Sequence, residues 1–225
     1  MKKILKCLAL ILALTALSPL SVLASENNPI SNDLQGANDD QFEELIKEIA
    51  NIKYTHPEYQ EEEILSVMNQ QHSRLGTGEN ARGLTDIWNA LTESEKKLCI
   101  RYPFAALKVN TAKNIAISQT EEKFGINGLG DKSDAFRHGL WNAEMTVLIG
   151  KDKAELFATA HEDKDVTGNE SDGYPKTAHR DMDLHNNEVG RAIGEQNKDV
   201  SEDEMANIIY QHIFSGTTQF VWLHE

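Results

Sequence analysis

The sequence is poor in cysteine and in basic residues. Of its two cysteines, Cys7 lies in the N-terminal apolar run, and only Cys99 follows that run. A chain processed after the run holds a single thiol, which excludes an internal disulfide, so its stability depends on a hydrophobic core. With 22 Lys and Arg against 36 Asp and Glu, the formal net charge is −14. Because this charge repels polyanions, we expect no non-specific binding to nucleic acid.

Long apolar runs are also scarce, and the longest stands at the N-terminus. Three lysines precede the segment LALILALTALSPLSVLA, which ends at Ala24 after residues that suit a signal peptidase. A retained membrane helix is the alternative, but Ser18 and Pro19 interrupt the run, and we expect no retained transmembrane segment. Residues 1–24 are therefore predicted to be a signal peptide. We expect a secreted, periplasmic or cell-envelope protein of about 201 residues after cleavage.

Composition divides the rest of the chain into three parts. Residues 25–40 are polar and lack an apolar period, which predicts a disordered linker. Residues 41–75 contain two apolar patterns with helical spacing and are interpreted as an N-terminal helical hairpin. The segment GTGENARG, residues 76–83, is expected to break the chain before a main helical domain over residues 84–225.

Helix start and stop signals are dense in the main domain. They comprise capping-box pairs at Thr92/Glu95 and Ser201/Glu204, a first-turn proline at Pro103, a cap at Ser133 or Asp134, and a closing glycine at Gly150. Only the tail TTQFVWLHE, residues 217–225, has strand-like composition. The predicted fold class is all-α, a single multi-helix domain with an N-terminal helical extension.

An unusual set of polar side chains occupies the segment SDAFRHGLWNAEMT. Asp134, His138, Trp141, Asn142 and Met145 follow helical spacing and share one face. A carboxylate one turn before an imidazole can fix its tautomer and raise its basicity, as a metal ligand or general base requires. The alternative is that Asp134 only caps the helix and His138 is a hydrogen-bonded core residue.

Two later helices carry further polar groups. The segment FATAHED ends with His161, Glu162 and Asp163, and acids at a helix C-terminus oppose the macrodipole, at about 0.3–1 kcal/mol each. The segment MDLHNNEVGRAIG places Asp183, Asn187 and Gly190 on one face, together with Asn186 and Gly194. Each glycine inside a helix is less favourable than Ala by about 0.5–1 kcal/mol, which indicates close approach of another helix or a ligand. A buried, fully satisfied polar network is the alternative.

Three of these residues form a candidate metal site. His138, His161 and Asp183 lie on different predicted helices, and two imidazoles with a carboxylate suit Zn, Mn or Fe. Their order is similar to that of the helical HD-type metal phosphohydrolases, but His161-Glu162 stands where those enzymes have an adjacent His-Asp pair. We expect the three residues either to hold a divalent metal or to share proton transfer.

The remaining polar residues receive catalytic roles in this hypothesis. Asp134 would orient His138, Glu162 would be the general base, and Arg137 with Asn187 would position an anionic or carbonyl substrate group. The sequence thus predicts a hydrolase acting on a substrate or cell-envelope partner. The competing hypothesis is a non-catalytic binding or interaction domain in which the polar stripes are structural.

Four segments together carry a family resemblance. LTESEKKLCIRYP, NGLGDKSDAFRHGLWNAEMT, FATAHE and MDLHNNEVGRAIG resemble an uncharacterised bacterial domain family of secreted and cell-surface proteins, over about residues 84–195. The resemblance implies one polar site and no particular chemistry. The matching positions are Asp134, Arg137, His138, Trp141, Asn142, His161, Glu162, Asp183, Asn186, Asn187 and Gly190.

Overall fold

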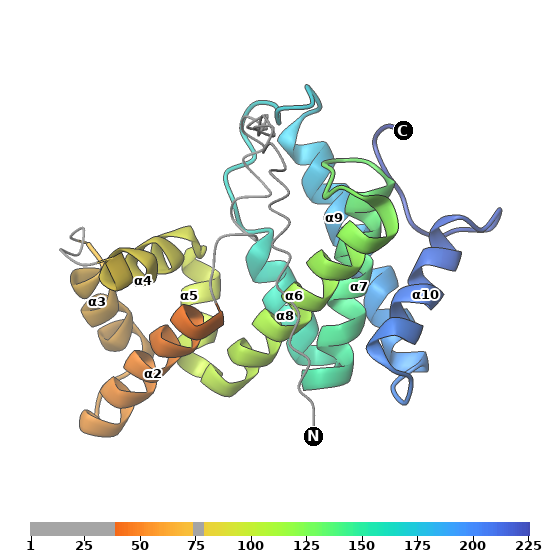
Figure 1. Cartoon of the computed structure of the whole chain (residues 1–225). Coiled ribbons are helices and arrows are strands. Elements are labelled where there is room, and N and C mark those ends of the chain that lie inside the picture. The colour runs from red at the N-terminus through yellow and green to blue at the C-terminus, as the bar shows by residue number, and fades with distance from the viewer. Residues whose placement is uncertain (1–38, 74–78) are drawn as a thin grey trace, which may run out of the picture.

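The computed structural model of the chain describes residues 39–73 and 79–225, which form nine helices and no strand (Figure 1). The helices are α2 (Asp39–Thr55), α3 (Glu61–Gln71), α4 (Glu79–Ala90), α5 (Glu93–Arg101), α6 (Pro103–Phe124), α7 (Lys132–Ile149), α8 (Lys151–His161), α9 (Lys176–Gln196) and α10 (Glu202–Ile213). The predicted all-α fold class is confirmed. The predicted signal peptide and residues 25–38 of the predicted linker lie outside the described residues.

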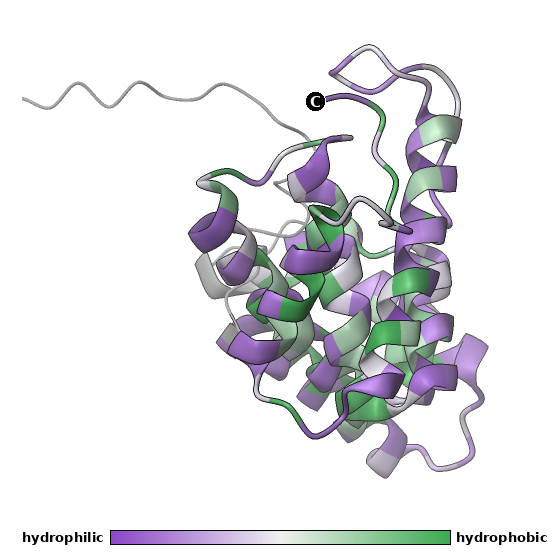
Figure 2. Ribbon diagram, turned by 90° about the vertical axis from the view of Figure 1, so that its right-hand side faces the viewer, coloured by the Kyte–Doolittle hydropathy of each residue, from purple (hydrophilic) through white to green (hydrophobic). Residues whose placement is uncertain are grey.

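Helix α7 is the centre of the fold. It packs against α6, α8, α9 and α10, and every residue from Ser133 to Thr146 is buried. Figure 1 shows α2–α5 gathered at one end of the molecule and α9 and α10 at the other, with α6, α7 and α8 between them. Hydrophobic residues meet where the helices face one another, and the outer faces are mostly hydrophilic (Figure 2). The polar stripe of α7 is therefore surrounded by protein.

Local capping explains where several helices begin and end. Thr92 Oγ1 accepts a hydrogen bond from the Glu95 amide at 3.0 Å, and the Glu95 carboxylate accepts one from the Thr92 amide at 2.8 Å. This capping box was predicted, as were Pro103 in the first turn of α6 and Gly150 at the end of α7. These signals act within one turn of helix, so the sequence alone reveals them.

The cap of α7 differs from the prediction. Asp131, rather than Ser133 or Asp134, is the N-cap, and its Oδ1 accepts hydrogen bonds from both of those amides at 2.9 and 3.1 Å. Because Asp131 satisfies these amides, the Asp134 side chain is available for other partners.

Two further boundaries differ from the expected ones. Helix α4 begins at Glu79, so the part of the expected break over 76–83 that the structure describes is helical. The tail over 217–225 is not a strand, although its composition suggested one. Its backbone instead pairs with a loop and a side chain: the Leu223 amide donates to Gly130 O at 2.7 Å, and the Val221 amide donates to Asn186 Oδ1 at 3.0 Å.

Helices α7 and α9 approach each other closely at glycines. A Cβ atom on Gly190 would lie 2.8 Å from Gly139 Cα, and one on Gly194 would lie 2.5 Å from the Ala143 carbonyl oxygen. The close approach predicted from the spacing of Gly190 and Gly194 is confirmed, and the partner is α7. This contact brings the polar stripes of the two helices together.

The structure also places Cys99 and shows whether any described helix could cross a membrane. Cys99 is buried in the core, and burial raises the pKa of its thiol, as expected for a packing residue. Within residues 39–73 and 79–225, no helix combines the length and apolar character needed to cross a bilayer.

Candidate metal centre

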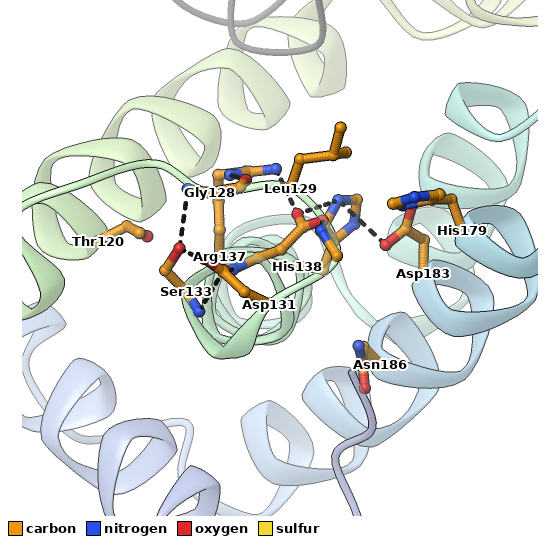
Figure 3. Close-up of polar contacts among 12 residues, drawn as sticks. Thr120, Gly128, Leu129, Asp131, Ser133, Arg137, His138, His179, Asp183 and Asn186 are labelled. Atoms are coloured by element: carbon orange, nitrogen blue, oxygen red, sulfur yellow. Dashed lines mark hydrogen bonds and ion pairs between the residues drawn. The ribbon is translucent and has the colours of Figure 1, made fainter. Parts of the chain in front are cut away.

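Two carboxylates and one imidazole converge between α7 and α9. His138 Nε2 lies 3.5 Å from Asp134 Oδ1 and 3.5 Å from Asp183 Oδ1 (Figure 3). In the described part of the chain, this is the one group of three or more His, Cys, Asp or Glu residues whose donor atoms all lie within 4.8 Å of one another. Carboxylate oxygen and imidazole nitrogen are ligands for Zn, Mn and Fe.

A chain of amide hydrogen bonds determines the tautomer of His138. Arg191 Nη1 donates to Asn142 Oδ1 at 2.9 Å, which directs the Asn142 amide nitrogen toward Asn187. That nitrogen donates to Asn187 Oδ1 at 2.5 Å. The same Asn187 oxygen lies 3.3 Å from His138 Nδ1. Because a carbonyl oxygen only accepts, Nδ1 of His138 carries the proton and donates.

In this tautomer, three atoms with lone pairs face one another: His138 Nε2, Asp134 Oδ1 and Asp183 Oδ1. Burial lowers the pKa of His138, despite the opposing charges of Asp134 and Glu162, and so favours the neutral imidazole. Burial and the same two charges raise the pKa of Asp183 well above its ordinary value. The Asp183 Oδ1 atom is buried and makes no hydrogen bond. A divalent cation would supply the positive charge that these atoms face.

Contacts with the loop before α7 hold the Asp134 carboxylate in place. Its Oδ2 accepts a hydrogen bond from the Gly130 amide at 2.7 Å, and its Oδ1 pairs with Arg137. Arg137 Nη1 in turn donates to Gly128 O at 3.1 Å. Gly130 has φ of +74°, a conformation that favours glycine. The loop therefore fixes the orientation of Asp134 before any ligand binds.

Glu162 lies near the Nδ1 atom of His138, and its charge also acts on Asp183. Its Oε1 is 3.9 Å from His138 Nδ1 and accepts a hydrogen bond of 3.4 Å from Asn187 Nδ2. The side chain is buried. Asn187 thus contacts both His138 and Glu162, and its role in this structure is to orient these two groups.

The structure places His161 away from the converging ligands. Its Nδ1 is 2.9 Å from Glu95 Oε1, and its ring packs edge-on against Trp141 with centroids 5.2 Å apart. The expected metal ligand His161 is therefore wrong, and Asp134 is the third member of the ligand group. The sequence could not reveal this exchange, because the position of Glu95 relative to His161 depends on how α5 packs against α8.

Two residues of the α9 motif have roles that the sequence analysis did not assign. Arg191 was missed, although it lies four residues after Asn187 and so shares its helix face. Asn186 points away from the ligand group: its Nδ2 donates to Val221 O at 2.9 Å, and its Oδ1 accepts from the Val221 amide. Asn186 therefore holds the C-terminal tail.

A shallow pocket between α6 and α7 reaches the His138 ring. Its lining consists of Lys113, Ala116, Ile117, Arg137, His138 and Trp141. Arg137 Nε is buried and has no hydrogen-bond partner. The surface of this pocket is therefore apolar, and the buried Arg137 guanidinium lies behind it, close to the ligand group.

Comparison with known proteins gives one match. A family model described as "Domain of unknown function (DUF6973)" matches residues 96–217, more than half of the chain. This match agrees with the resemblance of the motifs to an uncharacterised family. No curated protein and no solved structure matches the chain.

Proposed function

The chain belongs to the DUF6973 family, whose function is unknown, and we propose that its helical domain is an exported, metal-assisted hydrolase. Asp134, His138 and Asp183 bind one divalent cation in this proposal. The observation that carries it is the convergence of three donor atoms: Nε2 of His138 faces a carboxylate oxygen of Asp134 and one of Asp183 at 3.5 Å each.

Electrostatics supports a cation at this position. Two carboxylates near each other in a buried place repel, and each loses hydration that the protein must replace. Asp134 is compensated by Arg137 and the Gly130 amide, whereas Asp183 Oδ1 has no hydrogen-bond donor. Asn187 accepts the hydrogen bond of His138 Nδ1, which leaves Nε2 available to a metal ion, as metal-binding histidines generally require.

Three ligands leave coordination positions open for a substrate and a water molecule. A bound divalent cation polarises a carbonyl or phosphoryl oxygen and makes its water a nucleophile near neutral pH. Glu162 is the proposed general base that takes the proton from the attacking water. Its charge acts on both His138 and Asp183, and Asn187 holds its carboxylate. This role matches the one expected for Glu162 from the sequence.

The pocket between α6 and α7 is the proposed substrate entrance. Arg137 Nε, which is buried without a hydrogen-bond partner, would donate to an anionic or carbonyl oxygen of a substrate that widens this pocket. Trp141 and Ile117 supply an apolar wall for the adjoining part. The substrate class is therefore a small ester, amide or phosphoester whose polar head reaches Arg137.

A matched pair of variants tests the proposal. Asp183→Asn removes a proposed ligand charge, and Asp181→Asn makes the same change at an exposed position of the same helix. We expect Asp183→Asn to lose one equivalent of tightly bound Zn²⁺ in calorimetric titration and Asp181→Asn to retain it. With Zn²⁺ present, Asp183→Asn should also hydrolyse p-nitrophenyl acetate and p-nitrophenyl phosphate more slowly than the wild type, whereas Asp181→Asn should match the wild type.

The results separate the hypotheses. If Zn²⁺ binding is absent, or is the same in Asp183→Asn as in the wild type, the metal site is wrong. If the cation binds but neither ester is hydrolysed above background, the non-catalytic binding domain expected as the alternative is favoured.

A further inference from the structure

The start of α5 contacts the end of α8, where the proposed general base lies. Helix α8 ends at His161, and Glu162 is its C-cap. Thr92 Oγ1 donates a hydrogen bond to the Ala160 carbonyl at 2.7 Å, and His161 Nδ1 lies 2.9 Å from Glu95 Oε1. Two side chains from the start of α5 therefore contact the two residues that precede Glu162.

A third contact from α5 lies directly after Glu162. Ser94 Oγ donates a hydrogen bond to Asp163 Oδ2 at 2.5 Å. An acid at a helix C-terminus is unfavourable because it opposes the macrodipole, and this hydroxyl partly compensates Asp163. Side chains within residues 92–95 thus contact the chain on both sides of the base.

The backbone of α8 alone holds Glu162 weakly. The Glu162 amide donates to Ala158 O at 3.3 Å, and the Asp163 amide donates to Ala160 O at 3.3 Å. Both bonds are longer than the most common amide hydrogen bond, at about 2.9–3.0 Å. The bond from Asn187 to the Glu162 carboxylate is also long, at 3.4 Å. Because the last turn of a helix tends to fray, the position of Glu162 depends on groups outside α8.

We propose that Thr92 and Glu95 are positioning residues for the base Glu162, an inference that rests on the proposed function. These two residues form the capping box of α5. Glu95 Oε2 accepts the Thr92 amide at 2.8 Å, while Oε1 faces His161. One carboxylate thus links the start of α5 to the end of α8. A general base must lie within hydrogen-bond reach of the proton that it takes, so loss of this link should slow proton transfer.

The surroundings of Glu95 keep its carboxylate ionised. Burial opposes ionisation, but the charge and hydrogen bond of His161, together with the Thr92 amide, lower the pKa of Glu95 below its ordinary value. An ionised carboxylate accepts hydrogen bonds on both oxygens, as this link requires. His161 therefore serves the site as the residue through which Glu95 holds the end of α8.

Variants of Glu95 test this role in the protein with Zn²⁺ present. Glu95→Met keeps a side chain of similar length but removes both acceptor oxygens. Glu204→Met is the matched control, since Glu204 is an exposed residue at the same position in the first turn of α10. With p-nitrophenyl acetate, we expect kcat of Glu95→Met to fall by about 10- to 100-fold, because small displacements of a catalytic group have effects of this order. KM should not change, and Glu204→Met should match the wild type.

A conservative variant and two further readouts separate positioning from loss of fold or metal. Glu95→Gln should recover most of kcat, because Gln also serves in a capping box and keeps an acceptor oxygen. The Zn²⁺ affinity of Glu95→Met should equal that of the wild type, since the proposed ligands lie on α7 and α9. Hydrogen exchange of the Glu162 amide, measured by NMR, should be faster in Glu95→Met than in Glu204→Met. If circular dichroism shows that Glu95→Met does not fold, Thr92→Val replaces it, with Thr92→Ser as its conservative variant.

The outcomes distinguish failure of this role from failure of the proposed function. A wild-type kcat in Glu95→Met, combined with an inactive Glu162→Gln, would overturn the positioning role and leave the base in place. A fall in kcat that is accompanied by an equal fall in Zn²⁺ affinity would also overturn it, because Glu95 would then support the fold in general. If the wild type does not hydrolyse the ester, or if Glu162→Gln is as active as the wild type, the proposed base is wrong and the positioning role fails with it.

Discussion

At the residue scale, the proposal depends on which nitrogen of His138 carries the proton. Asn187 and Asn142 have no ionisable group, yet they determine this, because each can present an oxygen or a nitrogen to its neighbour. Arg191 ends the ambiguity, since a guanidinium only donates, and its bond to Asn142 Oδ1 directs the rest of the chain. The ability of His138 to bind a cation therefore depends on a residue that does not contact it.

Replacement of Arg191 by Met should weaken metal binding without removing a ligand. The Asn142 amide would lose its fixed orientation, and Nδ1 of His138 would no longer be held as the donor. We expect the Zn²⁺ affinity of the proposed metal site to fall by about 10- to 100-fold, the range for residues that orient metal ligands. Calorimetric titration measures the change, and Arg180→Met, an exposed change on α9, is the control. An affinity equal to that of the control would contradict the orienting role.

A second residue-scale prediction concerns Glu144, on another face of α7. Burial, and then the charge of Glu202, raise its pKa from 4.5 to about 7. The folded state therefore binds more protons than the unfolded state between these pH values. The stability contributed by protonated Glu144 is fully present below pH 4.5 and is lost as the pH rises through about 7.

Glu144→Gln should remove this pH dependence. The variant should be more stable than the wild type at pH 8, and the difference should shrink toward pH 4, because Gln is uncharged throughout. Urea unfolding of both proteins at a series of pH values measures it. A difference in unfolding free energy that stays constant with pH would show that Glu144 ionises normally in the folded protein.

At the element scale, the contact between α7 and α9 controls whether the site exists. The two helices supply all three proposed metal ligands, and their backbones approach at Gly190 and Gly194. The sequence predicted this contact because glycine inside a helix is unfavourable without a packing reason. It predicted the helices themselves from apolar period and caps, both of which are local signals.

Gly190→Leu should be destabilising. A Cβ atom at this position overlaps the backbone of Gly139, which cannot rotate away, and overpacking of this kind lowers stability by about 1–3 kcal/mol or more. Better helix propensity would compensate for at most about 1 kcal/mol. The matched control is Gly216→Leu, since nothing lies within 4 Å of a Cβ atom there. Thermal or urea unfolding measures the change in stability relative to the wild type. Equal or higher stability for Gly190→Leu would show that the two helices are not in close contact.

At the scale of the whole molecule, the sequence predicted which segments carry the site but not which side chains meet. Asp134, His138 and Asp183 were all recognised as unusual, yet His161 was expected in the ligand group and Asp134 only as its support. The difference depends on Asp131 taking over the cap of α7 and on Glu95 taking His161 as its partner. In both cases a group has more than one possible hydrogen-bond partner, and tertiary packing determines which partner it contacts.

The C-terminal tail illustrates the same limit over a longer distance. Its apolar and aromatic residues suggested a strand, because β-branched and aromatic residues favour extended backbone. In the fold, the tail is extended without a neighbouring strand and is held by Asn186 and by the loop at Gly130. His224 reaches Asp172 only through this route, so no local sequence pattern pointed to their hydrogen bond.

The most direct measurement is of the His138 imidazole nitrogens by ¹⁵N NMR, before and after addition of one equivalent of Zn²⁺. The account predicts a neutral ring protonated on Nδ1 in the metal-free protein, and a shift of Nε2 to the value of a metal-bound nitrogen on addition of Zn²⁺. Asp183→Asn should show the same starting tautomer and a weaker response. A ring protonated on Nε2, or an Nε2 signal that Zn²⁺ leaves unchanged, would contradict the proposed metal centre.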